Sequence, residues 1–233
     1  MDAVLLDLDD TLVDTRHAFR VALGEVAQQW LPHLDDDGFE AVVEHWTGDP
    51  GGHFAAYRRG EIDFARQRRL RAGLLQAVFD GPALDEPDFA RWEAVYEAAF
   101  SGSWRLCPDT VAFLDWLDAE RLPFAGVTNA AGPYQWDKLR RVALDHRVQV
   151  LVGTDALGLG KPDPRIFRLG CERLGVDPAR SGYVGDELDV DARGATAAGL
   201  TGIWLDRHGS GLTPDDVPVV RSLAELPALI ATL

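Results

Sequence analysis

Three carboxylates occur within four positions near the N-terminus, at Asp7, Asp9 and Asp10. They follow a short apolar run that is typical of a buried strand. A single aspartate there would be explained by turn formation or helix capping. Three of them repel one another and raise one another's pKa values unless a cation or hydrogen bonds compensate. Because Mg²⁺ prefers carboxylate oxygens together with water and substrate phosphate, the cluster indicates a cation site, with a capped turn as the simpler alternative.

The chemistry that suits such a cluster is phosphoryl transfer, which needs an in-line nucleophile, charge neutralisation and a proton for the leaving group. Asp7 is the candidate nucleophile, since a carboxylate can attack phosphorus and form an aspartyl-phosphate. In an extended chain Asp9 shares a face with Asp7. Asp9 can therefore protonate the leaving oxygen and later activate water.

Polar residues also end or follow three later apolar runs: Thr128 and Asn129 end the second, Lys161 follows the third, and Asp186 and Glu187 end the fourth. Five short apolar runs predict buried strands at residues 3–9, 124–129, 148–155, 182–187 and 202–206. Helical patterns lie between or after them at 109–121, 132–144, 164–174, 189–198 and near 222–232. This alternation predicts an α/β fold with a doubly wound parallel sheet. Since ligands bind beyond the carboxyl ends of parallel strands, the polar residues that follow the runs should meet at one edge.

The spacing of the runs breaks once, after the first strand. Residues 15–103 are rich in helix formers and show almost no strand pattern, which predicts an inserted all-helical domain. Its helices are expected near 15–31, 37–47, 61–79 and 87–101. The α/β core domain then consists of residues 1–14 and 104–233.

Four segments in this order, DLDDTLVD, VTN, GKPDP and GDELDVD, resemble the motifs of the haloacid dehalogenase (HAD) superfamily, in its phosphatase branch. The resemblance spans the whole chain, and the helical insertion resembles the C1-type cap of many such enzymes. It implies a Rossmann-like HAD core that hydrolyses phosphoric monoesters with Mg²⁺. Asp7, the backbone carbonyl of Asp9, and Asp186 would then hold the metal.

The resemblance also assigns roles to the remaining motif residues. Thr128, Asn129 and Lys161 would bind the phosphoryl group, with Thr128 and Lys161 also counted as catalytic. Asp191 would support the metal ligands or hold Lys161, and its spacing favours it over Asp189. Standing alone, Thr128 would be a strand-end residue satisfied locally. Lys161 alone would be a surface lysine, because Asp163 and Pro164 after it are typical of a helix start. Glu187 stands where a small polar residue is common, which leaves a metal role open for it.

Composition limits the partners and the compartment. A net charge of −15 argues against nucleic acid or an anionic membrane as a partner. Cys107 and Cys171 have no metal-site spacing and are expected to be buried free thiols. With no signal peptide or membrane span in the sequence, we expect a cytoplasmic protein, monomeric or homodimeric.

The expected function is Mg²⁺-dependent hydrolysis of a small phosphorylated metabolite through an aspartyl-phosphate. A phosphomutase would use the same nucleophile and acid, and no residue separates it firmly. Dehalogenation is disfavoured because it needs no acid such as Asp9. A non-catalytic, receiver-like acidic pocket is a further alternative, although receiver domains lack a first-strand DxDxT and a long helical insertion.

The helical insertion contains six arginines between residues 58 and 71, in an otherwise acidic protein. They are Arg58, Arg59, Arg66, Arg68, Arg69 and Arg71. Recognition of a second anionic group of the substrate is one interpretation. A solvated helix face paired with nearby acids is the favoured one. His53 and Trp46 flank a glycine-rich turn and either face a ligand or pack in the interior.

Overall fold

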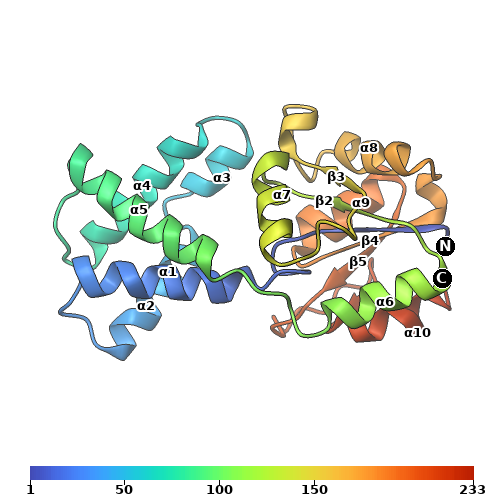
Figure 1. Cartoon of the computed structure of the whole chain (residues 1–233), viewed down its shortest axis with the longest axis horizontal. Coiled ribbons are helices and arrows are strands. Elements are labelled where there is room, and N and C mark those ends of the chain that lie inside the picture. Colours follow the sequence, from blue (N-terminus) through green and yellow to red (C-terminus); the bar gives the residue numbers. More distant parts are fainter. The chain divides into compact units, whose positions relative to one another are not determined.

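A computed structural model describes residues 1–233, and the chain divides into two compact units. One unit consists of residues 1–14 and 105–233, and the other of residues 15–104. Figure 1 shows the strands gathered in the first unit and only helices in the second.

The first unit is built on a six-stranded, fully parallel sheet. The strands are β1 (Ala3–Leu6), β2 (Phe124–Val127), β3 (Val150–Val152), β4 (Ser181–Gly185), β5 (Thr201–Leu205) and β6 (Val219–Val220). Their order is β3-β2-β1-β4-β5-β6, so β1 lies in the centre with later strands added on both sides. This order and the flanking helices confirm the predicted doubly wound α/β fold.

Helices cover both faces of this sheet (Figure 1). They are α6 (Thr110–Glu120), α7 (Gly132–Arg141), α8 (Pro164–Leu174), α9 (Arg193–Ala198) and α10 (Leu226–Ile230). On one face Leu5, Val127 and Tyr183 pack against Phe167 of α8 and Ala195 of α9. On the other face α6 and α10 lie side by side. Because both faces are covered, the strands are apolar throughout, which is why continuous apolar runs identified them.

Several predicted elements are shorter than their sequence patterns. The first strand was expected to reach residue 9 but ends at Leu6, because the chain then turns: the amides of Leu12 and Val13 both donate to the Leu8 carbonyl. The predicted helix 189–198 begins as a π-helical turn, Leu188–Ala192, before α9. The last helix is a short 3₁₀ turn followed by α10. The two-residue strand β6 was not predicted, since two residues show no pattern.

The second unit contains five helices. They are α1 (Thr15–Trp30), α2 (Asp36–Gly48), α3 (His53–Arg58), α4 (Phe64–Val78) and α5 (Glu86–Gly102). Asp35, Asp63 and Asp85 each cap a helix N-terminus by accepting a backbone hydrogen bond. The six-residue helix α3 was missed in the sequence because it follows a glycine-rich turn and is too short to show a period.

The interior of this helical unit is aromatic. The rings of Trp46, Trp92 and Tyr96 have centroids 5.1–5.7 Å apart. Trp46 is 2% exposed, as its packing interpretation predicted. Two of the arginines enter this cluster: the Arg68 guanidinium lies 4.2 Å from the Tyr96 ring centroid, and that of Arg71 lies 4.0 Å from the Trp46 ring centroid. The solvated-face interpretation is therefore wrong for these two residues.

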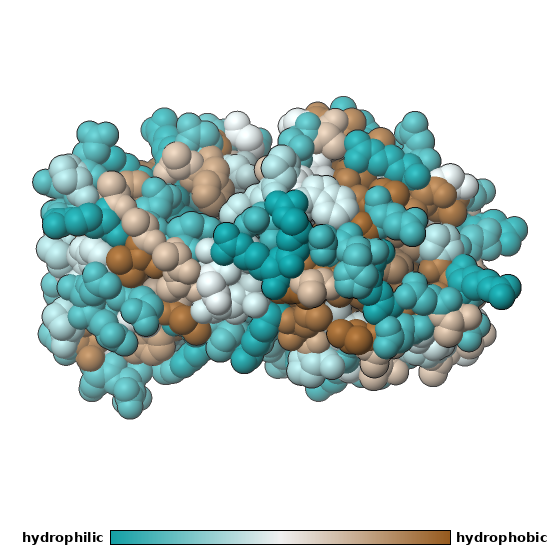
Figure 2. Space-filling view, in the orientation of Figure 1, coloured by the Kyte–Doolittle hydropathy of each residue, from teal (hydrophilic) through white to brown (hydrophobic).

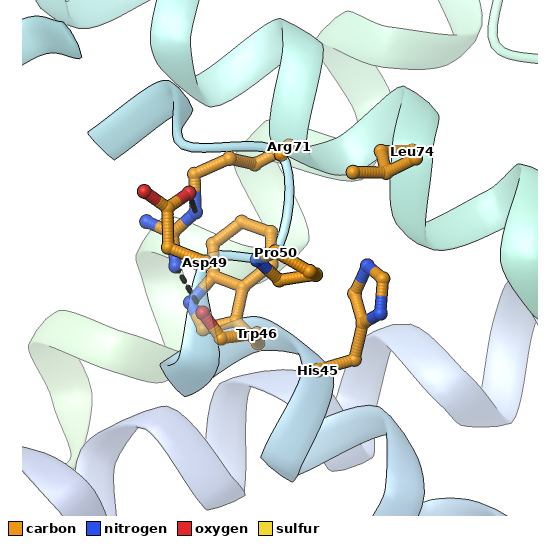
Figure 3. A pocket seen from close by; sticks show the side chains of 7 residues that line it. His45, Trp46, Asp49, Pro50, Arg71 and Leu74 are labelled. Atoms are coloured by element: carbon orange, nitrogen blue, oxygen red, sulfur yellow. Dashed lines mark hydrogen bonds and ion pairs between the residues drawn. The ribbon is translucent and has the colours of Figure 1, made fainter. Parts of the chain in front are cut away.

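A small cavity borders this cluster. It has a volume of about 10 Å³, room for roughly one water molecule, and Figure 3 shows Arg71 reaching past Trp46 towards Asp49 at its edge. The Arg71 guanidinium donates to the Trp46 carbonyl and lies 3.7 Å from a carboxylate oxygen of Asp49. His45 lines the opposite side.

The surface is mainly hydrophilic, and both cysteines are buried. Hydrophilic residues predominate over most of the face shown in Figure 2, with hydrophobic residues in small groups. Both cysteines, Cys107 and Cys171, are buried free thiols, as predicted. No helix combines the length and the apolar character that crossing a membrane requires.

Candidate active site

The predicted site lies where three neighbouring strands end. β1 pairs with β2 on one side and with β4 on the other, so Asp7, Thr128 and Asp186 follow adjacent strands at one edge of the sheet. Backbone hydrogen bonds continue the sheet by one residue here: the Asp7 amide donates to the Val184 carbonyl at 2.9 Å. The side chains that follow these strands are therefore held by the sheet itself.

Lys161 is the centre of a buried charge network. Its ammonium lies 2.6 Å from an Asp7 carboxylate oxygen, 2.7 Å from an Asp191 oxygen and 2.9 Å from the Tyr183 hydroxyl. Lys161, Asp7 and Asp191 are 5%, 5% and 1% exposed. Three donors of one ammonium thus meet three acceptors, which satisfies the buried charge. The sequence interpretation of Lys161 as a surface residue is excluded by this burial.

Asp186 completes a group of carboxylates. One carboxylate oxygen from each of Asp7, Asp186 and Asp191 lies within 4.8 Å of the other two. Glycine is required beside them, because a Cβ at Gly185 would stand 2.4 Å from Cγ of Asp191. Lys161 contacts Asp191 Oδ1, and the backbone amide of Glu187 donates to Asp191 Oδ2 at 3.0 Å. Asp9, also predicted near the metal, contributes no side-chain oxygen to this group.

A tight turn after β1 displays Asp9. Asp10 adopts a left-handed backbone with φ of 55°, and its amide donates to the Val13 carbonyl. Arg207 fixes this turn from outside by donating to the backbone carbonyls of Asp10 and Thr11. Arg207 is itself held by a bidentate ion pair with Asp109.

Two side chains of α7 bind the Asp9 carboxylate. Gln135 donates its Nε2 amide to Asp9 Oδ2 at 2.6 Å, and Lys138 donates its Nζ to Asp9 Oδ1. The Gln135 amide also reaches Thr128 Oγ1 at 3.0 Å. Gln135 and Lys138 are 0% and 2% exposed, whereas the Asp9 side chain is 36% exposed. Asp9 is therefore anchored from the interior while remaining accessible from solvent.

Thr128 and Asn129 use their side chains differently. Thr128 Oγ1 accepts from Gln135 and from the Ala130 amide at 3.2 Å, so its hydroxyl proton is free to point elsewhere. The Asn129 amide forms a reciprocal pair with the Lys161 backbone, at 2.6 and 3.0 Å. Asn129 thus holds the loop that presents Lys161.

Burial and neighbouring negative charges raise the pKa values of two aspartates in the site. Desolvation raises the pKa of Asp7 to about 7; the charges of Asp191 and Asp9 act in the same direction, while Lys161 opposes them. Burial and the charges of Asp7 and Asp191 also raise the pKa of Asp186 well above its usual value. Burial by itself would lower the pKa of Lys161, but the charges of Asp191 and Asp7 outweigh it and raise that pKa. The site therefore carries more negative charge than its own cations balance.

The neighbouring acidic residues lie outside this network. Asp189 has a side chain that is 80% exposed and pairs with Arg193 at 2.7 Å, which agrees with the preference for Asp191. Asp163 caps α8 by accepting from the Arg165 amide at 2.9 Å, and Pro164 is the first residue of that helix. The helix-start interpretation of GKPDP is thus correct for Asp163 and Pro164, and it coexists with a buried Lys161.

Four residues of the site were not predicted from the sequence: Tyr183, Gln135, Lys138 and Arg207. Tyr183 occupies a strand position that is ordinary for a core residue. Gln135 and Lys138 are three positions apart on one helix face, a spacing that could have drawn attention to them. Arg207 gave no signal, since its partners lie more than 95 positions away in sequence.

Comparisons with known proteins agree with this architecture. The sequence profile of the haloacid dehalogenase-like hydrolases matches residues 1–199. A phosphoserine phosphatase from Thermus thermophilus is 31% identical over 242 residues, covering 93% of this chain and 92% of that protein. A ribulose-1,5-bisphosphate 5-phosphatase from Halopiger xanaduensis is 31% identical, covering 88% and 84%.

A solved structure shares the fold over almost its whole length. The HAD-hydrolase YfnB from Bacillus subtilis, bound to magnesium, superimposes with a TM-score of 0.80 at 22% identity, covering 98% of this chain and 97% of that one. With a matching family profile over most of the sequence and two phosphatases at 31% identity, the chain belongs to the haloacid dehalogenase-like hydrolase family.

Proposed function

We propose that this protein is a Mg²⁺-dependent phosphatase that hydrolyses a small phosphorylated metabolite through an aspartyl-phosphate on Asp7. The chain is a phosphoric monoester hydrolase of the HAD-like family. The observation that supports the mechanism is the group of Asp7, Asp186 and Asp191 at the carboxyl edge of a parallel sheet, in which the buried Asp7 and Asp191 contact Lys161.

The donor set suits Mg²⁺. Asp7 and Asp186 offer carboxylate oxygens, which are the ligands that this hard cation prefers. Charge supports the same assignment: when Asp7, Asp9, Asp186 and Asp191 are all ionised, these four carboxylates against the two ammonium groups of Lys138 and Lys161 leave a net charge of −2. A divalent cation held by Asp7, Asp186 and the Asp9 carbonyl would neutralise that excess and polarise the phosphoryl oxygens.

In the first half-reaction Asp7 acts as the nucleophile and Asp9 as the acid. A carboxylate oxygen of Asp7 attacks phosphorus, and the bond from phosphorus to the leaving oxygen breaks. The leaving oxygen takes a proton from Asp9, which becomes a carboxylate. Asp9 suits this role because its side chain is partly exposed to solvent, and therefore to a substrate.

The second half-reaction returns both aspartates to their starting states. Water attacks the phosphorus of the aspartyl-phosphate while Asp9 accepts a proton from it. The bond between phosphorus and the Asp7 oxygen then breaks, releasing inorganic phosphate. Asp9 thus acts as the acid in the first step and as the base in the second.

The remaining polar groups would bind the transferred phosphoryl group. Thr128 is equipped to donate its hydroxyl proton, because both of its lone pairs are occupied. Lys161 supplies a compact positive charge, and Asp191 holds it in place at 2.7 Å. Since the Asn129 side chain is engaged by the Lys161 backbone, its contact with a phosphoryl oxygen would come from its backbone amide.

The substrate is expected to be a small phosphorylated metabolite, because relatives with about 31% identity are named for two different ones, phosphoserine and ribulose-1,5-bisphosphate. The test is phosphate release from a panel of phosphorylated metabolites with Mg²⁺. We expect one class of compound to give kcat/KM above about 10⁴ M⁻¹s⁻¹, as in typical enzymes. Chelation by EDTA should abolish turnover.

Asp7→Asn and Asp189→Asn form a matched pair of variants for this assay. Both remove one carboxylate, but Asp189 is exposed and paired with Arg193. We expect Asp7→Asn to be inactive and Asp189→Asn to retain wild-type turnover. Phosphate release by Asp7→Asn at the wild-type rate would refute the aspartyl-phosphate mechanism. An isomerised sugar phosphate as product, without free phosphate, would instead identify a mutase.

A further inference from the structure

Helix α7 carries two buried polar side chains that both point at one partly exposed carboxylate. Gln135 and Lys138 lie three positions apart on the same face of the helix, and each binds a different oxygen of Asp9. A carboxylate with one donor on each oxygen cannot rotate without losing a hydrogen bond. The Asp9 side chain is thereby fixed in orientation as well as in position.

Stability alone does not explain a buried lysine at this place. Removing an ammonium group from water is costly, and buried ion pairs are often no better for stability than apolar residues of the same volume. Lys138 is 2% exposed, although its partner Asp9 is 36% exposed and could be solvated without it. The cost of burying Lys138 is understandable if the orientation of Asp9 matters for function.

Gln135 adds a second link. Its Nε2 amide bridges Asp9 Oδ2 at 2.6 Å and Thr128 Oγ1 at 3.0 Å. One amide group therefore sets the separation between Asp9 and Thr128. In the proposed mechanism these are the proton donor and a ligand of the phosphoryl group, so their separation determines whether the proton reaches the leaving oxygen.

We infer that Lys138 and Gln135 are positioning residues, which fix the Asp9 carboxyl group for proton transfer to the leaving oxygen. This inference rests on the proposed phosphatase function. The proton moves from Asp9 to the leaving oxygen in the first half-reaction and from water to Asp9 in the second. Lys138 and Gln135 neither gain nor lose a proton in either step.

The inference predicts a dependence on the leaving group. An alkoxide needs a proton as it departs, whereas nitrophenolate leaves readily without one. The ratio kcat/KM reports steps up to the transfer of phosphorus to Asp7, so it isolates the step in which Asp9 is the acid. The probes are p-nitrophenyl phosphate and a primary alkyl phosphate that the wild-type enzyme hydrolyses.

Lys138→Met and Gln135→Leu should each lower kcat/KM for the alkyl phosphate by about 10- to 100-fold, a part of the 10²–10⁴ typical of general acid catalysis. For p-nitrophenyl phosphate the loss should stay below about threefold, since that leaving group hardly uses the acid. Lys138→Arg keeps a charged donor and should recover part of the loss. Arg140→Met, on the same helix but with a side chain 57% exposed, is the matched control and should change neither rate.

The strongest test compares Lys138→Met in the wild-type enzyme with Lys138→Met added to Asp9→Asn. Asp9→Asn should show the same leaving-group pattern, and adding Lys138→Met to it should have no further effect, because the two residues act as one unit. Equal losses on both probes for folded Lys138→Met, or losses that multiply with those of Asp9→Asn, would overturn the inference. If Lys138→Met does not fold, Gln135→Leu, alone and combined with Asp9→Asn, carries the same test.

Failure of the inference differs from failure of the proposed function. A leaving-group pattern in Asp9→Asn that is missing from the α7 variants removes the positioning role alone. A wild-type protein that releases phosphate from neither probe removes the phosphatase proposal, and the positioning role with it.

Discussion

Two clusters in this protein each contain a buried positive charge, but the charges have different partners: carboxylates in one cluster and aromatic rings in the other. In the α/β unit Lys161 contacts two carboxylates at 2.6 and 2.7 Å. In the helical unit Arg68 is equally buried, yet the acid with which it pairs, Glu97, is 3.9 Å away. Two of the Arg68 nitrogens, Nε and Nη1, have no hydrogen-bond partner. Aromatic faces take the place of acids there.

The difference teaches which buried charges point to a function. Around Lys161 the negative charge exceeds the positive, and the pKa values of Asp7 and Asp186 are raised as a result of burial and mutual repulsion. A bound cation would reduce the repulsion between these carboxylates and so stabilise the site. The Arg68 cluster is stabilised by cation–π contacts and gains nothing from a further positive charge. Perturbed carboxylates therefore distinguish the candidate site from a structural cluster.

The largest effect is expected from Lys161→Met. Removal of the ammonium leaves Asp7 and Asp191 buried and uncompensated, which should lower the free energy of unfolding by about 3–5 kcal/mol near neutral pH. In the proposed mechanism Lys161 also supplies positive charge to the phosphoryl group, so its removal should lower kcat by about 10²–10³-fold, as for other lost electrostatic contacts in active sites. Urea denaturation and steady-state phosphate release measure the two effects separately.

Two controls sharpen that result. Lys161→Arg keeps the charge but changes its shape, and it should recover more stability than activity. Lowering the pH should reduce the stability difference between Lys161→Met and wild type, because protonated carboxyl groups need no cation. A Lys161→Met protein as stable as the wild type near neutral pH would contradict the network described here.

The sequence predicted the parts of this site that lie within short segments. Asp7, Asp186 and Lys161 stand in motifs whose residue types and order suggest phosphoryl transfer, and the apolar runs located the strands that carry them. The sheet order then follows from general rules for parallel sheets. Asp191 was preferred over Asp189 on the spacing of the family motif, and its contact with Lys161 agrees.

The partners that the sequence did not reveal are the ones set by three-dimensional packing. Gln135 and Lys138 meet Asp9 only because α7 turns one particular face to the end of β1, more than 120 positions away in sequence. Arg68 was misjudged because charge in a helix is usually solvated. Its burial depends on Trp46 and Tyr96, which lie on two other helices.

The second prediction, of intermediate size, is that the stability of the protein depends on pH and on Mg²⁺. The native pKa of Asp7, about 7, lies above the unfolded value, so the native state binds more protons between about pH 4 and 7. Without divalent cations, the contribution of Asp7 to stability should therefore fall as the pH rises through that window. The raised pKa of Asp186 has the same sign. The raised pKa of Lys161 acts only at high pH, outside the window.

Mg²⁺ should reverse this loss. At 100 times its Kd, Mg²⁺ stabilises by about 2.7 kcal/mol, roughly 5–10 °C in Tm for a chain of this size. The increase should be larger at about pH 8 than at about pH 5, where protons compete for the carboxylates. Thermal unfolding with EDTA or saturating Mg²⁺ measures it, with Asp186→Asn as the control that should respond least. An equal increase at both pH values would argue against carboxylate binding.

The smallest effect is expected from Arg68→Met, the counterpart of Lys161→Met in the helical unit. The substitution loses a cation–π contact of up to about 2 kcal/mol. It also removes two unpartnered buried nitrogens, which cost about 1–3 kcal/mol each, and gains methionine contacts with the rings. Stability should therefore change by less than about 1 kcal/mol or increase. Urea denaturation followed by tryptophan fluorescence suits this test, because Trp46 and Trp92 lie in the cluster. A loss as large as that of Lys161→Met would mean that Arg68 is held by an acidic partner after all, and that burial without a close carboxylate does not separate structural from functional charge.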